Sequence, residues 1–477
     1  MEGDTTLNTA SSETLKKNLE KWHFFIRQLN EAVSPAHFPL TNPGVIQKII
    51  DTQGMNLAEG FQRLQKDLAE NNASFLNIPL TDKTAFSVGD QVAATPGHVI
   101  FQNDLIQLIH YQPTTQKIYQ RPVLFIPPWI NKYYILDLQP ENSMVRWLID
   151  QGICVFMISW VNPDRHYREK TFGDYLKEGP LAAIEAITAL TGIKDINIAG
   201  YCIGGTLLAC LLATLSKNAC HATLHSATFF TTMLDFSSPG DLGLFLDEPQ
   251  LMLLEQNMAS KGYMDGAILA AIFSMLRAGD LIWPVWVKHY LKNEPLSASP
   301  FLYWNADSTH IPEQVHKFYL RNMYQHNRLA TPSLLEIDGI PVDLSNITQP
   351  CWFVATERDH IAPWQACYQS SQLIKSPREF VLAGAGHVAG IINPPARNRY
   401  GYRLSGEKFD TAESFANQAT FNEGSWWPAW CSWLKKHSGK QVSVNSKKSK
   451  SIPSLDAAPG NYVKVTLTDI AKKETES

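Results

Sequence analysis

The sequence has few charged residues and no marked excess of either sign. Lys, Arg, Asp and Glu make up 18% of its 477 residues, and the formal net charge is −4. A nucleic-acid-binding protein needs clustered Lys and Arg to neutralise phosphates. We therefore expect no nucleic-acid partner.

Long hydrophobic runs and a leader-like start are also missing. The longest apolar runs, such as 207–215 and 266–276, fall short of the roughly 20 residues that span a bilayer. Residues 1–17 lack a basic segment followed by an apolar core, so we expect no secretory signal. These absences predict a soluble, cytoplasmic protein with no transmembrane segment.

The seven cysteines show neither a disulfide framework nor a zinc site. Their number is odd, most lie in apolar stretches, and no two form a CxxC pair. This pattern is typical of free thiols in a reducing compartment. No His/Cys cluster has the spacing of zinc ligands, so we expect no metal ion. The cysteines are Cys154, Cys202, Cys210, Cys220, Cys351, Cys367 and Cys431.

The apolar pattern divides the chain into three regions. Amphipathic stripes within 12–33 and 57–68 predict helices in an N-terminal region over 1–90. We expect these stripes to pack against the protein's own body rather than against a partner or a lipid surface. Residues 91–440 are expected to form an α/β domain, and 441–477 a polar linker and C-terminal segment. The first stripe consists of Leu15, Leu19, Trp22, Ile26 and Leu29.

The α/β domain is predicted from short β-branched runs that alternate with helix-length segments. Such runs are typical of a mainly parallel sheet covered on both faces. The expected strands are 122–128, 153–159, 196–200, 222–230, 351–356 and 378–384. About 120 residues separate the fourth strand from the fifth, and we assign 232–345 to a cap. Nine aromatic residues within 281–330 indicate a cap with an apolar underside.

The segment GYCIGG, residues 200–205, joins an apolar strand to an apolar helix. Glycines on both sides of Cys202 in this context indicate a nucleophile elbow, a strained turn that presents the nucleophile. Ser is the usual residue at that position. The alternative, a buried cysteine in a glycine-rich turn, is less favoured because the strand, the glycines and the helix are all present.

A general base and an orienting acid are expected after the nucleophile, in the order nucleophile, acid, base. Glu357 and Asp359 both follow the strand 351–356, and position alone does not separate them. His387 follows the last strand, whereas His437 lies by the Lys-rich linker, so His387 is the expected base. A purely structural histidine is the alternative.

Two backbone N–H groups are expected to form an oxyanion hole. One belongs to Ile203, directly after the nucleophile. Pro127 and Pro128 have no N–H, so Trp129 is the first donor after the early strand. A Cys paired with a His can exist as a thiolate and exchange with a thioester. The residues therefore predict acyl transfer from a thioester donor, with the aromatic cap excluding water.

With these residues in place, the chain resembles the class I polyhydroxyalkanoate synthases, which polymerise short 3-hydroxyacyl-CoA. The resemblance runs from about Val88 to the end of the chain. It is carried by blocks that include FIPPWINKYYILDLQPENSMVRWL, SWVNPD, GYCIGGT, FLYWNADSTHIP, ERDHIAPW, GHVAGIINPPA and GSWWPAW. It implies an α/β-hydrolase fold with Cys202 as nucleophile, Asp359 rather than Glu357 as the acid, and His387 as the base.

The resemblance also implies a substrate, partners and a location. The expected reaction polymerises 3-hydroxyacyl-CoA, with (R)-3-hydroxybutyryl-CoA as the expected monomer, and releases CoA without a cofactor. The expected partners are a second copy of the chain in a homodimer, the growing polyester at a granule surface, and a phasin. In the acid loop, His360 and Trp364 are candidates for lining the pocket. Many relatives have Cys where this chain has Trp129, whose ring we expect near the pocket mouth.

Two other functions compete with this interpretation. A thioesterase or depolymerase of the same fold would more often carry Ser at the elbow. A non-catalytic granule protein would not need Cys202, Asp359 and His387 together.

Overall fold

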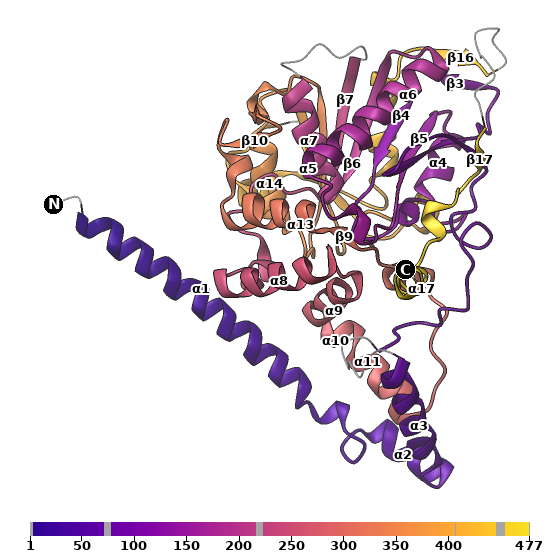
Figure 1. Ribbon diagram of the computed structural model, residues 1–477, viewed down its shortest axis with the longest axis vertical. Coiled ribbons are helices and arrows are strands. Elements are labelled where there is room, and N and C mark those ends of the chain that lie inside the picture. Colours follow the sequence, from indigo (N-terminus) through magenta and orange to yellow (C-terminus); the bar gives the residue numbers. More distant parts are fainter. Residues whose placement is uncertain (1–2, 71–77, 216–222, 406, 445–453, 477) are drawn as a thin grey trace. The chain divides into compact units, whose positions relative to one another are not determined.

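The computed structural model describes residues 3–70, 78–215, 223–405, 407–444 and 454–476 (Figure 1). Within these ranges the chain forms two compact units. The first comprises residues 1–85, 241–247 and 267–306, and the second comprises 86–240, 248–266 and 307–477. The central sheet and every candidate site residue belong to the second unit.

An 11-stranded sheet forms the centre of the second unit. Its six middle strands, from β13 to β5 in sheet order, run parallel, and antiparallel strands extend both edges. In sheet order the strands are β15 (Thr420–Asn422), β14 (Tyr402–Ser405), β13 (Arg378–Ala383), β12 (Cys351–Thr356), β7 (Thr223–Phe230), β6 (Asp195–Tyr201), β4 (Val123–Ile126), β5 (Val155–Trp160), β2 (Ile106–Tyr111), β1 (Gly97–Gln102) and β17 (Asp456–Ala457). The six strands expected from the apolar runs are the six parallel ones, so the α/β prediction is confirmed.

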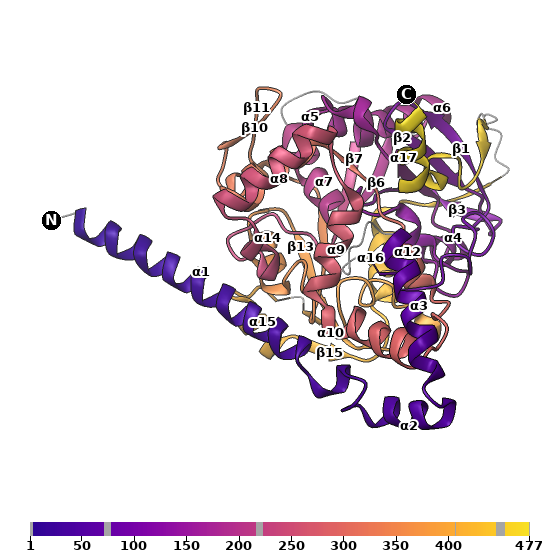
Figure 2. The ribbon, with the colours of Figure 1, turned by 60° about the horizontal axis from the view of Figure 1, so that its bottom comes forward.

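Helices of the second unit pack against this sheet. Figure 1 and Figure 2 both show α7 beside β6, and the two elements are in contact. On α16, the Trp430 ring contacts the rings of Phe125 and Phe230, and its indole N–H donates to Thr228 at 3.1 Å. The helices of the second unit are α4 (Met144–Asp150), α5 (Phe172–Leu176), α6 (Ala182–Thr191), α7 (Ile203–Leu215), α8 (Glu248–Lys261), α13 (Glu313–Tyr319), α14 (Trp364–Gln372), α15 (Ala412–Gln418), α16 (Trp427–His437) and α17 (Leu467–Glu476).

Two-stranded sheets and the C-terminal segment complete the second unit. The pairs are β3 (Lys117–Tyr119) with β16 (Gln441–Ser443), β8 (Tyr263–Met264) with β9 (Ile311–Pro312), and β10 (Leu335–Ile337) with β11 (Ile340–Val342). The segment expected as a polar linker contains β16, while its Lys-rich residues 445–450 lie outside the described residues. Cys220 also lies outside them, and the six described cysteines are free.

The first unit is helical where it is described. Its helices are α1 (Gly3–Ala32), α2 (Pro43–Thr52), α3 (Met55–Glu70), most of α9 (Gly266–Leu276), α10 (Ala278–Leu281), α11 (Trp283–Val285) and α12 (Pro300–Ala306). Helix α3 packs closely on the segment Trp286–Leu291. The two backbones approach so closely that a Cβ on Gly60 would overlap with the carbonyl of Tyr290. The expected helices in the N-terminal region are confirmed.

The first amphipathic stripe does not pack within the first unit. Leu15, Leu19, Ile26 and Leu29 are exposed, and Trp22 is 66% exposed. Phe24 is 2% exposed instead and packs with Leu244 and Leu276. Because Phe24 lies two residues, or about 200°, around the helix from Trp22, α1 contacts its unit through the side opposite to the stripe.

The insertion predicted as a cap over 232–345 contributes to both units. Among the nine aromatic residues counted within 281–330, Phe318, Tyr319 and Tyr324 belong to the second unit and the rest to the first. No single helix in the described part of the chain has the length and apolarity to cross a bilayer. The bent pair Gly266–Leu276 and Ala278–Leu291, with 95° between its halves, meets the length and composition criteria only jointly.

Close packing at the start of α7 joins β6 to the end of β4. A Cβ on Gly204 would overlap with the carbonyl oxygen of Ile126 and lie 2.8 Å from that of Pro127. A Cβ on Gly205 would overlap with the side chain of Thr232. Glycine at both positions lets α7 begin directly against the neighbouring backbone.

We expect Gly204→Ala to destabilise the protein by about 3 kcal/mol or more, because backbone atoms of β4 would have to move to admit the methyl group. The matched control is Gly192→Ala, where a Cβ meets nothing within 4 Å and only the left-handed backbone, at φ 73°, opposes the change. That variant should lose about 1–2 kcal/mol. Thermal and denaturant unfolding measure both, and equal losses would contradict the packing argument.

Candidate active site

Cys202 occupies a sharp turn between β6 and α7. Its φ is 54°, in the left-handed region that a residue with a Cβ seldom adopts. The Cys202 N–H donates to the carbonyl of Phe230 at 2.9 Å, and its own carbonyl accepts from the N–H groups of Gly205 and Thr206, which starts the helix. The side chain is half-buried. This is the strand–turn–helix geometry expected of a nucleophile elbow.

Asp359 and His387 come together at the carboxyl end of the parallel strands. Asp359 follows β12 and His387 follows β13, and His387 Nδ1 lies 2.7 Å from Asp359 Oδ2. Both residues are buried. The Cys202 side chain lies near enough to His387 to raise the pKa of the imidazole. The structure therefore brings together the three residues singled out from the sequence.

Asp359 is held as an acceptor by its own loop, whereas Glu357 is exposed. The carboxylate of Asp359 accepts from the N–H groups of Ile361 at 2.9 Å and Ala362 at 2.8 Å, and from the Thr356 hydroxyl at 3.2 Å. These donors leave Oδ2 directed at His387. The geometry favours Asp359 over Glu357 as the partner of the imidazole.

The charge state of His387 is set by competing effects. Burial disfavours the imidazolium, but the Asp359 carboxylate and the Cys202 side chain favour it and raise the pKa of His387 to about 10. The Asp359 carboxylate and Cys202 thus favour the protonated ring over the neutral one. An imidazolium beside a cysteine is the arrangement that supports a reactive thiolate.

Three tyrosines that the sequence analysis did not single out surround this pair. Burial first, then the nearby charge of Cys202, raises the pKa of Tyr201 and of Tyr324, while burial and Tyr324 raise that of Tyr319. All three phenols are therefore neutral at physiological pH. Tyr201 stacks on the His387 ring at 5.6 Å and donates to the His387 carbonyl at 3.2 Å, and Tyr319 pairs with the Thr206 hydroxyl at 3.4 Å. Tyr201 could have been found from its place beside Cys202 in GYCIGG.

The two expected oxyanion donors lie on adjoining segments. Ile203 is the first residue of α7, a position whose N–H has no intrahelical acceptor. Trp129 follows the β4 carbonyls on which Gly204 packs. Within the described ranges neither N–H donates to another protein group. Their joint role stays a prediction.

The ring of Trp129 lies elsewhere than expected. It is 2% exposed and packs among Trp160, Phe172 and Tyr175, with ring centroids 5.6, 6.3 and 5.1 Å away. The expectation of a ring at the pocket mouth is therefore wrong. The large apolar ring gains more by burial in this aromatic cluster than by exposure beside a polar site.

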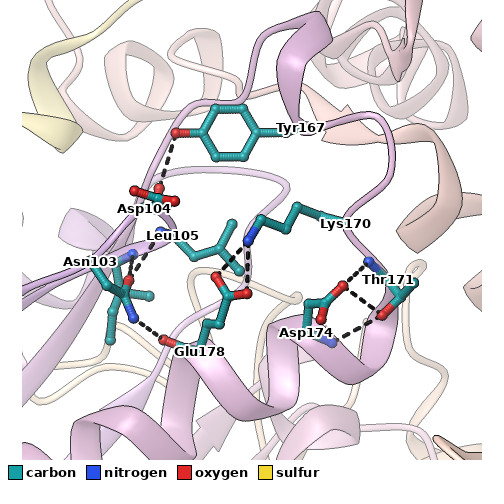
Figure 3. A network of polar contacts seen from close by, with 9 residues as sticks. Asn103, Asp104, Leu105, Tyr167, Lys170, Thr171, Asp174 and Glu178 are labelled. Carbon is teal, nitrogen blue, oxygen red and sulfur yellow. Dashed lines mark hydrogen bonds and ion pairs between the residues drawn. The ribbon is translucent and has the colours of Figure 1, made fainter.

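A polar network holds the helix that supplies half of this cluster. Helix α5 carries Phe172 and Tyr175, and Figure 3 shows the contacts around it. Lys170 pairs with Glu178 at 2.7 Å, and the Asn103 amide donates to the Glu178 carbonyl at 2.8 Å. The Tyr167 hydroxyl donates to the Asp104 carbonyl at 3.0 Å, and Thr171 and Asp174 cap α5 reciprocally. The turn between β1 and β2 thus anchors the loop after β5.

The remaining candidates are placed as follows. His360 and Trp364 are half-buried in the segment after Asp359, and their contact with a substrate stays a prediction. His437 ends α16 rather than lying in a linker, and it packs on Trp433 and on His225, at the opposite end of β7 from Phe230. No three His, Cys, Asp or Glu side chains gather as a metal site in the residues that the structure describes.

We expect Asp359→Asn to lower the pKa of His387 by about 1–3 pH units, because it removes the carboxylate that stabilises the imidazolium. Histidine NMR titration, with His387→Gln for assignment, measures this change. The control is Glu357→Gln, which neutralises an exposed carboxylate two residues away and should leave the titration of His387 unchanged. An unaltered titration in Asp359→Asn would contradict the assignment.

Comparisons with known proteins place this site in a family. A model described as "Poly-beta-hydroxybutyrate polymerase (PhaC) N-terminus" matches residues 5–148, and a model of the alpha/beta hydrolase fold matches 121–394. The chain is 44% identical to the poly(3-hydroxyalkanoate) polymerase of Methylorubrum extorquens over 446 residues, which cover 93% of this chain and 73% of that protein.

Two further relatives are similar over nearly the same length. The poly(3-hydroxyalkanoate) polymerase subunit PhaC of Rhizobium etli is 42% identical, covering 92% of this chain and 69% of that protein. The corresponding subunit of Cupriavidus necator is 38% identical, covering 94% and 76%. The chain therefore belongs to the poly(3-hydroxyalkanoate) polymerases, a family of acyltransferases built on the α/β-hydrolase fold.

Proposed function

We propose that the chain polymerises 3-hydroxyacyl-CoA through an acyl-thioester on Cys202, with His387 and Asp359 completing a catalytic triad. The observation that carries this proposal is the position of His387. One ring nitrogen is held by Asp359 at 2.7 Å, and the ring lies near enough to Cys202 for that side chain to raise its pKa. A thiol nucleophile keeps the bound acyl group activated, which suits transfer to an alcohol.

The first half of the cycle loads Cys202. Its thiolate attacks the thioester carbonyl of the substrate and forms a new C–S bond. The oxyanion accepts hydrogen bonds from the N–H groups of Trp129 and Ile203. The bond to the CoA sulfur then breaks, and that sulfur takes the proton of the His387 imidazolium. CoA leaves as a thiol, and His387 is left neutral.

The second half extends the chain. Neutral His387 takes the proton of the 3-hydroxyl of an incoming 3-hydroxyacyl-CoA, and the oxygen attacks the acyl-thioester. The C–S bond to Cys202 breaks, which restores the thiolate and the imidazolium. The lengthened acyl-CoA acylates Cys202 again, so each added unit releases one CoA. The cycle uses no metal ion and no organic cofactor.

The substrate and partners follow the resemblance to the short-chain class. The monomer is (R)-3-hydroxybutyryl-CoA, bound in a pocket to which His360 and Trp364 contribute. The working form is a homodimer in the cytoplasm at the surface of a polyester granule, where a phasin is a candidate partner. A thioesterase or depolymerase of the same fold is the competing function, and the thiol at the elbow disfavours it.

We expect Cys202→Ala to abolish CoA release from 3-hydroxybutyryl-CoA, and Cys202→Ser to lose most of it, because a hydroxyl is not ionised near neutral pH. Cys210→Ala, which removes a buried thiol of helix α7, is the matched control and should stay active. Released CoA and insoluble polyester are measured together. Free 3-hydroxybutyrate without polymer would favour a thioesterase instead.

We expect 3-hydroxybutyryl-CoA to be used faster than the eight-carbon 3-hydroxyacyl-CoA by about tenfold or more, since a short-chain pocket leaves no room for the extra methylene groups. Initial rates of CoA release at matched concentrations test this. Equal rates would remove the short-chain assignment and leave the triad proposal intact.

A further inference from the structure

The chain leaves the second unit after Gly266 and returns to it at Asp307. Within the second unit, the chain segments at these two points are hydrogen-bonded to each other. Strands β8 and β9 pair, and the Gly266 N–H donates to His310 Nδ1 at 3.0 Å. We call the two paired segments, Tyr263–Gly266 and Asp307–Pro312, the neck.

The neck is also bonded to the loop that carries Trp129. The Thr309 hydroxyl donates to the Trp129 carbonyl at 2.6 Å, and the Thr309 N–H donates to the Ile130 carbonyl at 3.2 Å. An antiparallel bridge joins Asn131 to Ser308. Thr309 is 3% exposed, so these bonds are shielded from water. Residues 129–131 of the loop after β4 therefore lie alongside residues 308–309 of the neck.

A buried ion pair closes the same contact. Lys132 Nζ lies 2.6 Å from Asp307 Oδ1, and the Tyr134 hydroxyl donates to Asp307 Oδ2 at 2.8 Å. The Lys132 side chain is only 3% exposed. Removing one partner from such a pair leaves a buried charge, whereas replacing both with neutral groups is often tolerated. The ion pair therefore helps to fix the position of the loop after β4 relative to the neck.

We propose that Thr309 and Asp307 are positioning residues that aim the Trp129 N–H at the developing oxyanion. They act through the loop backbone. Thr309 holds the carbonyl of the same residue whose N–H is the donor, while the aromatic cluster holds its ring. The inference rests on the proposed function, because it presumes an oxyanion hole built from Trp129 and Ile203. Neither residue had a signal in the sequence pattern that linked it to this loop.

Thr309→Val tests the hydroxyl with little change of shape. We expect the single-turnover release of CoA from 3-hydroxybutyryl-CoA to slow by about 10–100-fold, since losing one oxyanion donor outright costs about 100–1,000-fold. The loss should appear in kcat with KM nearly unchanged, because the donor acts in the transition state. Thr309→Ser keeps the hydroxyl and should restore most of the rate.

A second readout separates positioning from a general structural effect. Iodoacetamide alkylates Cys202 by displacement at a saturated carbon, a reaction that develops no oxyanion. Alkylation should therefore keep its wild-type rate in Thr309→Val. The matched control is Thr214→Val, which removes another buried hydroxyl that bonds a backbone carbonyl, at 2.9 Å on α7. It should lose comparable stability and retain acyl transfer.

The ion pair is tested by Asp307→Asn, Lys132→Met and the double variant. Each single variant should slow CoA release by a larger factor than it slows the alkylation of Cys202. The double variant should recover part of the loss, because it leaves no unpaired buried charge. This series keeps the inference testable if Thr309→Val unfolds.

The outcomes distinguish this inference from the proposed function. If alkylation of wild-type Cys202 leaves polymerisation intact, the proposed function fails. If Cys202 is essential but Thr309→Val releases CoA within twofold of wild type, or loses alkylation and CoA release in parallel, the positioning role is overturned.

Discussion

The left-handed backbone of Cys202 is the constraint on which the site depends. A residue with a Cβ pays about 1–2 kcal/mol for this conformation, and the turn persists because glycines let α7 start directly against the neighbouring backbone. The sulfur is thereby presented at the carboxyl end of β6. Parallel strands end at the same edge of a sheet, so the loops after β12 and β13 deliver Asp359 and His387 to that edge. Three residues far apart in the chain meet through sheet topology alone.

Two kinds of group surround Cys202: the paired side chains of Asp359 and His387, and a set of neutral phenols. Backbone and hydroxyl donors orient the Asp359 side chain, and Asp359 in turn favours the imidazolium of His387. Burial raises the pKa values of Tyr201, Tyr319 and Tyr324, so these phenols add polarity without charge. No second cation or anion among them competes for the sulfur.

Much of this arrangement follows from local sequence. The six parallel strands were predictable because each is a continuous apolar run, and Cys202 was predictable because strand, glycines and helix are contiguous. His387 followed from its place after the last strand, but Asp359 could be separated from Glu357 only by the family resemblance. The edge strands β1, β2 and β17 are less apolar or very short, so their pairing had no comparable signal. The packing side of α1 and the burial of the Trp129 ring depend on tertiary partners that no local pattern specifies.

The two halves of the proposed oxyanion hole differ in how far their positions depend on contacts with remote residues. The Ile203 donor is inseparable from the elbow, since its N–H is free because α7 begins there. The Trp129 donor follows two prolines in a loop without helix or strand structure of its own. The carbonyl of Trp129 accepts a hydrogen bond from Thr309, 180 positions along the chain. A donor that depends on remote contacts can be moved without disturbing the nucleophile. Under the proposed mechanism, variation in the neck would alter transition-state stabilisation while leaving Cys202, His387 and Asp359 in place, so this loop would be the adjustable half of the site.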